Sequence, residues 1–414
     1  MFCVNCGAEN PDGAQFCTKC GQPTGSATGN SRSSVATAAK NAVGGVADFL
    51  NEVTGGEGHV ELRFKDFFTN VPKRHTKEET RELFACGSPS TTPKIQDVST
   101  EWPKPWLYSR VFAVLLVTFM GCVILWEGFQ NPNAFPNLMF IGALMVPFSV
   151  LVFFYETNVP RNISIAQVVE MFFVGGVASI LAIYPVSALL PEGGVGNVGA
   201  AMITGIIEEV AKILIVAFFM SRTKGRNYIL NGLLIGAAVG AGFAVFESAG
   251  YAFNSFMENY ELGISAMLRS DGNISMNDVY AYGYAGVTSI TALRATLAIG
   301  GHVVWAAAEG AAMAICEAGD GFKWKQLIDI RFLIVSVICV VLHGIWDTYP
   351  IPFLSTIEIP LFGDLRYVLL IIAIWVVIVV MLNRGLAQIN ELSSGQGQPS
   401  GASSVSVESL DDSR

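Results

Sequence analysis

The feature that most constrains this chain is a series of apolar runs, each close to the roughly twenty residues that a helix needs to cross a lipid bilayer. Only 14% of its 414 residues are charged, against about 25% in a typical soluble domain. This deficit excludes an ordinary soluble protein, and nothing in the chain favours nucleic-acid binding. We predict an all-α polytopic bundle of about eight transmembrane helices in the lipid bilayer. The predicted spans are 107–128, 136–156, 165–190, 198–220, 227–253, 288–316, 332–350 and 366–384.

Charged residues between the apolar runs predict the orientation. The connections 221–226 and 317–331 each contain three basic residues, whereas 129–135 and 191–197 contain none. The connection 254–287, which we expect to be a long loop, has one arginine against four acidic residues. Basic loops remain in the cytoplasm. We therefore predict a multi-pass protein of the cell membrane with both termini cytoplasmic.

Four cysteines near the N-terminus form two C-x2-C pairs separated by ten residues: Cys3, Cys6, Cys17 and Cys20. This spacing brings four thiolates together around a tetrahedral zinc ion, and such a closed site is structural. The alternative, two disulfides in a secreted domain, is disfavoured because the chain opens without a secretory signal. We predict a zinc ribbon in the reducing cytoplasm, with a cytoplasmic protein as a candidate partner.

Composition divides the chain into four predicted parts. The region after the ribbon is rich in Gly, Ser and Ala, as flexible linkers are. Val60 to Phe84 is expected to form a short helical segment on the membrane surface. The Ser-rich and acidic C-terminus is typical of disorder. The predicted boundaries are 1–24 for the zinc ribbon, 25–104 for the linker and cytoplasmic juxtamembrane segment, 105–386 for the membrane domain and 387–414 for the disordered cytoplasmic tail.

Three ionisable residues lie inside the fourth apolar run: Glu208, Glu209 and Lys212. One charge at the centre of a membrane helix costs roughly 2.5–3.5 kcal/mol on insertion scales. A structural ion pair between Glu208 and Lys212, four residues apart, is the alternative to a functional role. That pair leaves Glu209 about 100° away around the helix. Buried carboxylates in membranes usually mark ion paths, proton relays or catalytic sites.

Further polar residues lie at membrane depth on the next three predicted helices: Glu247, Arg294, His302, His343 and Asp347. We expect them to converge with the glutamates on one cavity between the midplane and the outer face. Such a group suits hydrolysis, because a carboxylate can take a proton from water and an imidazole can donate to an oxyanion. Glutamates and histidines can equally hold a metal that activates the water. No H-E-x-x-H motif is present, so the use of a catalytic metal stays open.

Four motifs resemble the signature of PrsW-type intramembrane proteases, within the wider superfamily of CAAX prenyl endopeptidases. They are EEVAK at 208–212, GFAVFESAGY at 242–251, Arg294-x7-His302 and His343-G-I-W-Asp347, in the order of that signature. The resemblance covers roughly 105–385, the membrane protease domain. It implies an endopeptidase that cuts a membrane-anchored protein, such as an anti-sigma-factor-like regulator, on its outer side.

The resemblance also implies roles for individual residues. Glu208 and Glu209 would activate water, Glu247 and His302 would be further site groups, and His343 would be an oxyanion or metal-type group. The chain departs from the family at Ser248 and Asp347, where the family tends to have Asn. An ionised Asp cannot donate a hydrogen bond to an oxyanion. Asp347 would then orient His343 or carry a proton.

Lys212 and Arg294 are assigned supporting roles in this interpretation. Because Lys212 is expected to pair with Glu208 and keep it ionised, Glu209 is the preferred general base. Two other functions stay open: a proton-coupled transporter, since carboxylates and histidines also relay protons, and an inactive membrane receptor whose zinc ribbon binds a partner. The chain lacks the internal repeat typical of many transporters.

Overall fold

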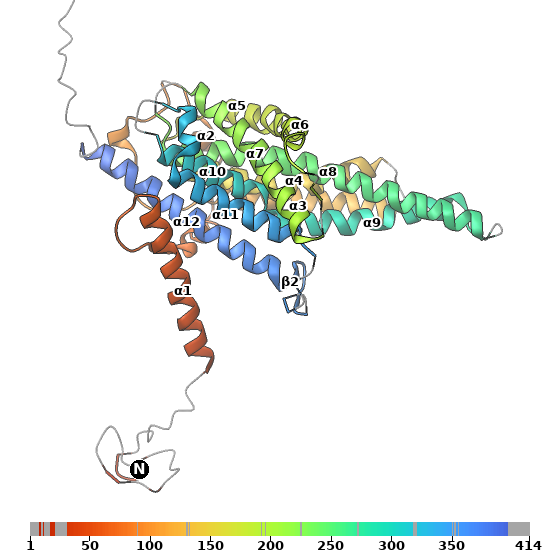
Figure 1. The fold of residues 1–414 in the computed structure, drawn as a ribbon, viewed down its shortest axis with the longest axis horizontal. Coiled ribbons are helices and arrows are strands. Elements are labelled where there is room, and N and C mark those ends of the chain that lie inside the picture. Colours follow the sequence, from red (N-terminus) through yellow and green to blue (C-terminus); the bar gives the residue numbers. More distant parts are fainter. Residues whose placement is uncertain are drawn as a thin grey trace, which may run out of the picture.

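The computed structural model (Figure 1) describes residues 8, 9, 11, 17–20, 31–88, 90–129, 131, 133–191, 193–194, 196–223, 226–270, 273–317, 321–349, 351, 353–354 and 356–395. Cys3, Cys6 and the tail beyond 395 therefore lie outside the described residues. Its helices are α1 (Ser31–Val53), α2 (Lys77–Phe84), α3 (Leu107–Val123), α4 (Ala134–Thr157), α5 (Ile165–Glu170), α6 (Gly176–Ser187), α7 (Val198–Arg222), α8 (Ile229–Arg269), α9 (Met276–Leu297), α10 (His302–Ile315), α11 (Ile330–Asp347) and α12 (Leu365–Ser393).

Short elements complete the described chain. They are the helical turns η1 (Phe64–Phe68), η2 (Ile95–Asp97), η3 (Ile124–Gly128), η4 (Met171–Gly175), η5 (Ala298–Gly300) and η6 (Trp324–Ile328), and the strands β1 (Glu358–Ile359) and β2 (Gly363–Asp364). The two strands pair antiparallel, with Glu358 opposite Asp364.

Seven helical segments of the described chain are long and apolar enough to cross a membrane. They are Leu107–Gly128, Ala134–Thr157, Ile165–Ser187, Ile229–Arg269, Met276–Ile315, Ile330–Asp347 and Leu365–Ser393. α7 is also long enough to cross a membrane, with 25 residues. It is not among the seven because it contains three closely spaced charged residues, Glu208, Glu209 and Lys212. The predicted all-α polytopic membrane bundle is confirmed.

α8 lies at the centre of the bundle and α3 at its edge. Within their most apolar stretches, 94% of the residues of α8 are buried, against 11% for the α3–η3 segment. Exposed Val114 and Val117 on α3 are explained by contact with lipid rather than water. The start of α3 is capped by Glu156 of α4, whose carboxylate accepts the backbone N–H groups of Trp106, Leu107 and Tyr108.

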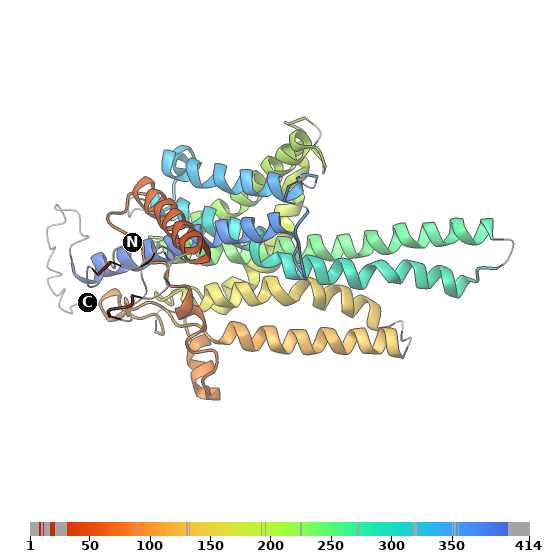
Figure 2. The same cartoon turned by 90° about the horizontal axis from the view of Figure 1, so that it is seen from below.

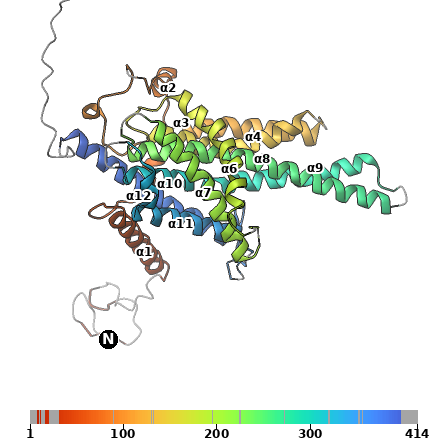
Figure 3. The same ribbon diagram turned by 45° about the horizontal axis from the view of Figure 1, so that its top comes forward.

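The connection 254–287 is not the predicted loop but a helical hairpin. α8 has 41 residues, about 60 Å of helix, which is twice the ~30 Å hydrocarbon thickness. Its distal part and α9 project together beyond the bundle (Figure 1; also Figure 2 and Figure 3). Tyr284 of α9 packs on Trp126 and on Phe256 of α8. Polar residues end the apolar run near 253, but the two helices continue by packing against each other.

The predicted helix 288–316 is broken where it reaches His302. α9 ends at Leu297, η5 follows, and α10 begins at His302. His302 is therefore the first residue of a helix rather than mid-helix as predicted. The backbone of Gly301 lines a cavity, which is where irregular backbone is tolerated inside a membrane protein.

The juxtamembrane segment packs onto the bundle through part of its apolar residues. Phe67 is buried against Trp102, Phe153 of α4 and Trp375 of α12, whereas Phe68 is 62% exposed. The segment 31–53, predicted as part of the flexible linker, forms α1. α12 continues to Ser393, so the first seven residues of the predicted disordered tail are helical.

The predicted orientation makes the α8–α9 hairpin extracytoplasmic, and labelling can test this. Glu258 is exposed on α8, and Arg222 is exposed at the opposite end of the bundle, at the end of α7. In a variant that lacks native cysteines, we expect Glu258→Cys to react with an impermeant thiol reagent on intact cells and Arg222→Cys to react only after lysis. The reverse pattern would invert the topology.

Candidate active site

A cavity of about 290 Å³ lies between α7, α8, α9, α10 and α11. It is the place where most of the predicted polar residues meet, although they come from five different helices. The cavity is lined by six of the eight predicted residues of this site: Glu208, Glu247, Arg294, His302, His343 and Asp347. Glu209 and Lys212 do not line it. They lie behind it and are fully buried.

Lys212 pairs with Glu209, so the predicted pair between Lys212 and Glu208 is wrong. Its Nζ lies 2.7 Å from Glu209 Oε1 and 2.8 Å from His302 Nδ1, and 4.8 Å from the centre of the Phe243 ring. On one helix both i,i+3 and i,i+4 pairs can meet. Contacts to His302 and Phe243 place the ammonium on the Glu209 side. The premise for choosing Glu209 as the base, that it has no cationic partner on its own helix, is therefore wrong.

His302 is held from both sides. Because an ammonium has only donors, Nδ1 of His302 must accept from Lys212, and Nε2 then carries the hydrogen. Nε2 lies 3.0 Å from Glu247 Oε2, which also accepts from Arg294 Nη2 at 2.8 Å. Arg294 Nε in turn donates to Ser248 Oγ. This chain of polar contacts fixes the ring of His302 in one orientation.

His343 is oriented by two carboxylates. Its Nδ1 lies 2.6 Å from Glu209 Oε1, and its Nε2 lies 3.3 Å from Asp347 Oδ2, one helical turn further along α11. The ring is 2% exposed. Because Glu209 also binds Lys212, it accepts the Nδ1 hydrogen of His343 as a carboxylate, and Nε2 faces the cavity. The predicted orienting contact from Asp347 is present.

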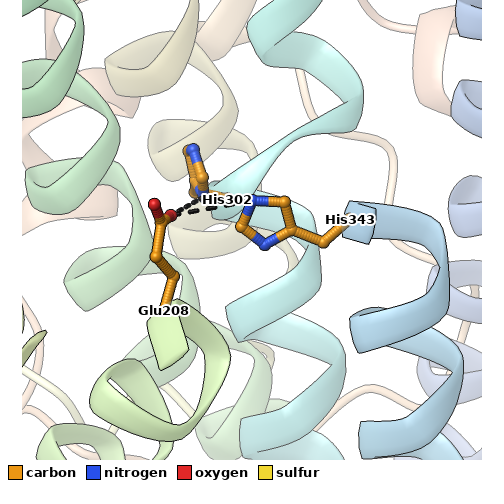
Figure 4. A group of neighbouring side chains, drawn as sticks. All are labelled: Glu208, His302 and His343. Atoms are coloured by element: carbon orange, nitrogen blue, oxygen red, sulfur yellow. Dashed lines mark ion pairs between the residues drawn. The ribbon is translucent and has the colours of Figure 1, made fainter. Parts of the chain in front are cut away.

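Glu208 is the carboxylate that faces both imidazoles (Figure 4). Its Oε2 lies 3.6 Å from His343 Nε2 and 4.0 Å from His302 Nδ1. Oε2 is buried and has no hydrogen-bond partner within the described chain. A buried polar atom without a partner usually points to an absent water, ion or ligand. By type and spacing, Glu208, His302 and His343 could hold a metal ion, since one ligand atom from each lies within 4.8 Å of the others.

Close helix packing sets these distances. A Cβ on Gly205 of α7 would press on the backbone of α11 at Val340 and Gly344, on either side of His343. A Cβ on Gly240 of α8 would collide with the carbonyl of His302. The two glycines let α7 and α8 approach the histidine-bearing helices closely.

Sequence reasoning missed a buried carboxylate, Glu309. It is fully buried on α10, and Glu209, Lys212 and Ser336 lie beside it. The signal was available, because Glu309 follows His302 by seven residues and so shares its helix face. Trp305, which stacks on His343, shows no such signal, because an apolar aromatic is the ordinary occupant of a membrane helix.

Comparison with known proteins identifies two families in the chain. The model of the zinc-ribbon domain family matches residues 2–24, and the model of the PrsW family intramembrane metalloprotease matches residues 163–382, just over half of the chain. Neither the curated proteins nor the solved structures gave a match. Within the second match lie all six cavity-lining residues named above. The chain belongs to the PrsW family of intramembrane metalloproteases.

Proposed function

We propose that this intramembrane protease hydrolyses a peptide bond of a membrane-anchored protein with Glu208 as the general base. The observation that carries the proposal is the free, buried Oε2 of Glu208, which faces the cavity between two oriented imidazoles. The other cavity carboxylates are engaged: Glu247 with Arg294 and His302, and Asp347 with His343. A water beside Glu208 Oε2 would lie within reach of the base that must take its proton.

In this mechanism Glu208 takes a proton from the attacking water and later gives it to the leaving amine. His343 is placed to donate from Nε2 to the oxyanion in its doubly protonated form, because Glu209 accepts at Nδ1 and holds the ring. The fixed contacts to Glu209, Lys212 and Glu247 mean that little reorganisation accompanies the reaction. Such preorganisation is the main source of electrostatic stabilisation in hydrolases.

The family description implies a metal, and the donor types suit one. Catalytic zinc usually has three protein ligands and an open fourth position, at which it lowers the pKa of a bound water. Here both ring nitrogens of His302 are already taken, Nδ1 by the Lys212 ammonium and Nε2 by Glu247. A cation on Nδ1 would meet the ammonium at 2.8 Å. Among the three described donors, Glu208 Oε2 is the ligand atom without a hydrogen-bond partner, and His343 Nε2 is shared with Asp347 at 3.3 Å. The site therefore does not fit a three-ligand ion, and we derive no step through one.

This assignment predicts the response to metal removal. We expect the full chain to contain one zinc per molecule, held by the ribbon, and to retain turnover of a membrane-anchored substrate after treatment with a strong chelator. The matched variant Cys17→Ser, Cys20→Ser should contain no stoichiometric metal and should also turn over substrate. Metal content by elemental analysis and turnover are measured together. A stoichiometric metal in the cysteine variant, with activity lost on chelation and restored by zinc, would show that His302 releases Lys212 to bind it.

For the substrate, we propose a membrane-anchored regulator of the anti-sigma-factor type, cut on its outer side, with the zinc ribbon binding a cytoplasmic partner. Both termini would then be cytoplasmic. The test compares the membrane proteome of cells that make the intact chain with that of cells that make Glu208→Gln. We expect a shortened membrane protein in the first that stays full-length in the second. Identical proteomes, together with proton-coupled uptake of a solute, would favour the transporter alternative.

A further inference from the structure

A second cavity, of about 170 Å³, lies at the end of the bundle where α1 meets α12. It is separate from the candidate active site and shares no lining residue with it. Three arginines from different parts of the chain line it: Arg226 just before α8, Arg331 at the start of α11 and Arg384 on α12. Thr54 and Gly55, at the end of α1, also contribute to its wall.

Two of these guanidinium groups each have a nitrogen without a hydrogen-bond acceptor in the described chain. The Nε atoms of Arg226 and Arg384 are buried and have no hydrogen-bond partner among the described residues. Arg384 Nη2 donates to the backbone carbonyl of Gly55 at 3.0 Å, and the carboxylate of Glu391 acts on Arg384 as a nearby charge without a hydrogen bond. Both side chains are half-buried, and a buried Nε–H without an acceptor is costly unless a ligand supplies one.

Two carboxylates, Glu317 and Glu391, also line the cavity, and Asp329 precedes the lining residue Arg331 by two positions. Both oxygens of Glu317 accept from Asn227, at 2.8 and 2.9 Å. Asp329 accepts two hydrogen bonds from the guanidinium of Arg331. This contact lowers the pKa of Asp329 to about 2, so the pair stays ionised at neutral pH. Glu391 is exposed on the last turns of α12. Glu391 acts on Arg384 as a nearby charge, but none of the three carboxylates has a hydrogen bond to Arg226 or Arg384 among the described contacts.

We propose that this cavity binds a phosphate group between Arg226 and Arg384. The planar guanidinium fork matches the oxygens of phosphate and binds them with charge-assisted hydrogen bonds. Ile229, the first residue of α8, also lines the cavity, so the positive end of a 41-residue helix dipole faces the same space. Basic pockets between the ends of membrane helices bind lipid head groups. The phosphate therefore comes either from an anionic lipid or from solution.

A phosphate bound in this cavity would hold α1, which follows the zinc ribbon in the chain, against the membrane domain. Arg384 contacts Gly55 directly, and Thr54 and Gly55 belong to the wall of the cavity. A phosphate held by Arg226 and Arg384 adds bonds across the junction of α1, α8 and α12. The site would thus couple the position of α1 to the presence of the anion, independently of the catalytic residues.

The test measures the thermal midpoint of the delipidated full chain in detergent as inorganic phosphate replaces chloride at constant ionic strength. We expect phosphate to raise the midpoint of the native chain. Arg226→Gln and Arg384→Gln should each weaken phosphate binding about tenfold, the effect of losing a charge-assisted contact. The matched control is Arg222→Gln, since Arg222 is exposed, lies over the Phe218 ring and does not line the cavity. It should respond as the native chain does.

A lipid arm separates the two sources. If the phosphate belongs to a lipid, bilayers containing phosphatidylglycerol should stabilise the native chain relative to pure phosphatidylcholine and remove the response to inorganic phosphate. If it is free phosphate, that response should persist in both bilayers. Equal responses of Arg226→Gln, Arg384→Gln and Arg222→Gln, or no response of the native chain to either ligand, would overturn the proposal. If a variant fails to fold, equilibrium dialysis of labelled phosphate against the native chain measures binding directly, and no bound phosphate and no stabilisation by phosphatidylglycerol would contradict the proposal.

Discussion

Replacing Glu208 by Gln is expected to lower turnover by about 10²- to 10⁴-fold, the usual contribution of a general base, while leaving the free energy of unfolding nearly unchanged. The buried Oε2 of Glu208 has no hydrogen-bond partner among the described residues, so the amide that replaces it breaks no hydrogen bond there. Gln has nearly the same volume but cannot take the proton from water. The measurement is turnover of a membrane-anchored substrate, with unfolding followed in parallel in detergent.

The matched control for this variant is Glu170→Gln, an isosteric change at an exposed carboxylate of α5 that does not line the cavity. It should alter neither turnover nor stability. Turnover within a few-fold of native in Glu208→Gln would remove Glu208 as the base and leave Glu247 and Asp347 as the remaining cavity carboxylates. A large loss of stability would instead show that Glu208 has a structural partner.

The polar residues of the site could be predicted from the sequence because charge inside an apolar run is costly and therefore conspicuous. His302, His343 and Asp347 are conspicuous for the same reason, because they are polar residues within apolar runs on neighbouring predicted helices. Their partners could not be predicted in the same way. Whether Lys212 turns toward Glu208 or Glu209 depends on His302 and Phe243, which come from other helices. Helix periodicity alone permits both choices.

The fold class was predictable and its irregularities were not. Hydropathy marks where a helix is in lipid, so it located the spans but ended α8 near 253, where polar residues begin. The hairpin beyond that point is held by contacts between α8 and α9, such as Phe256 against Tyr284, which a single helix does not reveal. The break before His302 likewise leaves no gap in the apolar run. Two adjacent glycines, Gly300 and Gly301, are the sequence feature that marks this break.

Replacing Glu209 by Gln is expected to have a second large effect, which includes a loss of stability as well as a loss of turnover. Glu209→Gln leaves the ammonium of Lys212 fully buried without its counter-charge. Breaking a buried pair from one side typically costs about 3–5 kcal/mol in the free energy of unfolding. The same change removes the carboxylate that orients His343, so activity should fall as well. Glu209 is thus a positioning residue, and its loss should lower both stability and turnover, whereas loss of Glu208 should lower turnover alone.

The double variant Glu209→Gln, Lys212→Met separates the two contributions of Glu209. Methionine fills much of the space of the lysine stem without a charge, and replacing a whole buried pair by neutral groups is often close to neutral for stability. We expect it to recover most of the stability lost in Glu209→Gln but not its turnover, because His343 and His302 both lose their orienting contacts. Chemical unfolding and turnover of the three proteins measure this. Native-like stability of Glu209→Gln alone would contradict a charged Lys212 at this position, since only an uncharged amine could remain buried there without its partner.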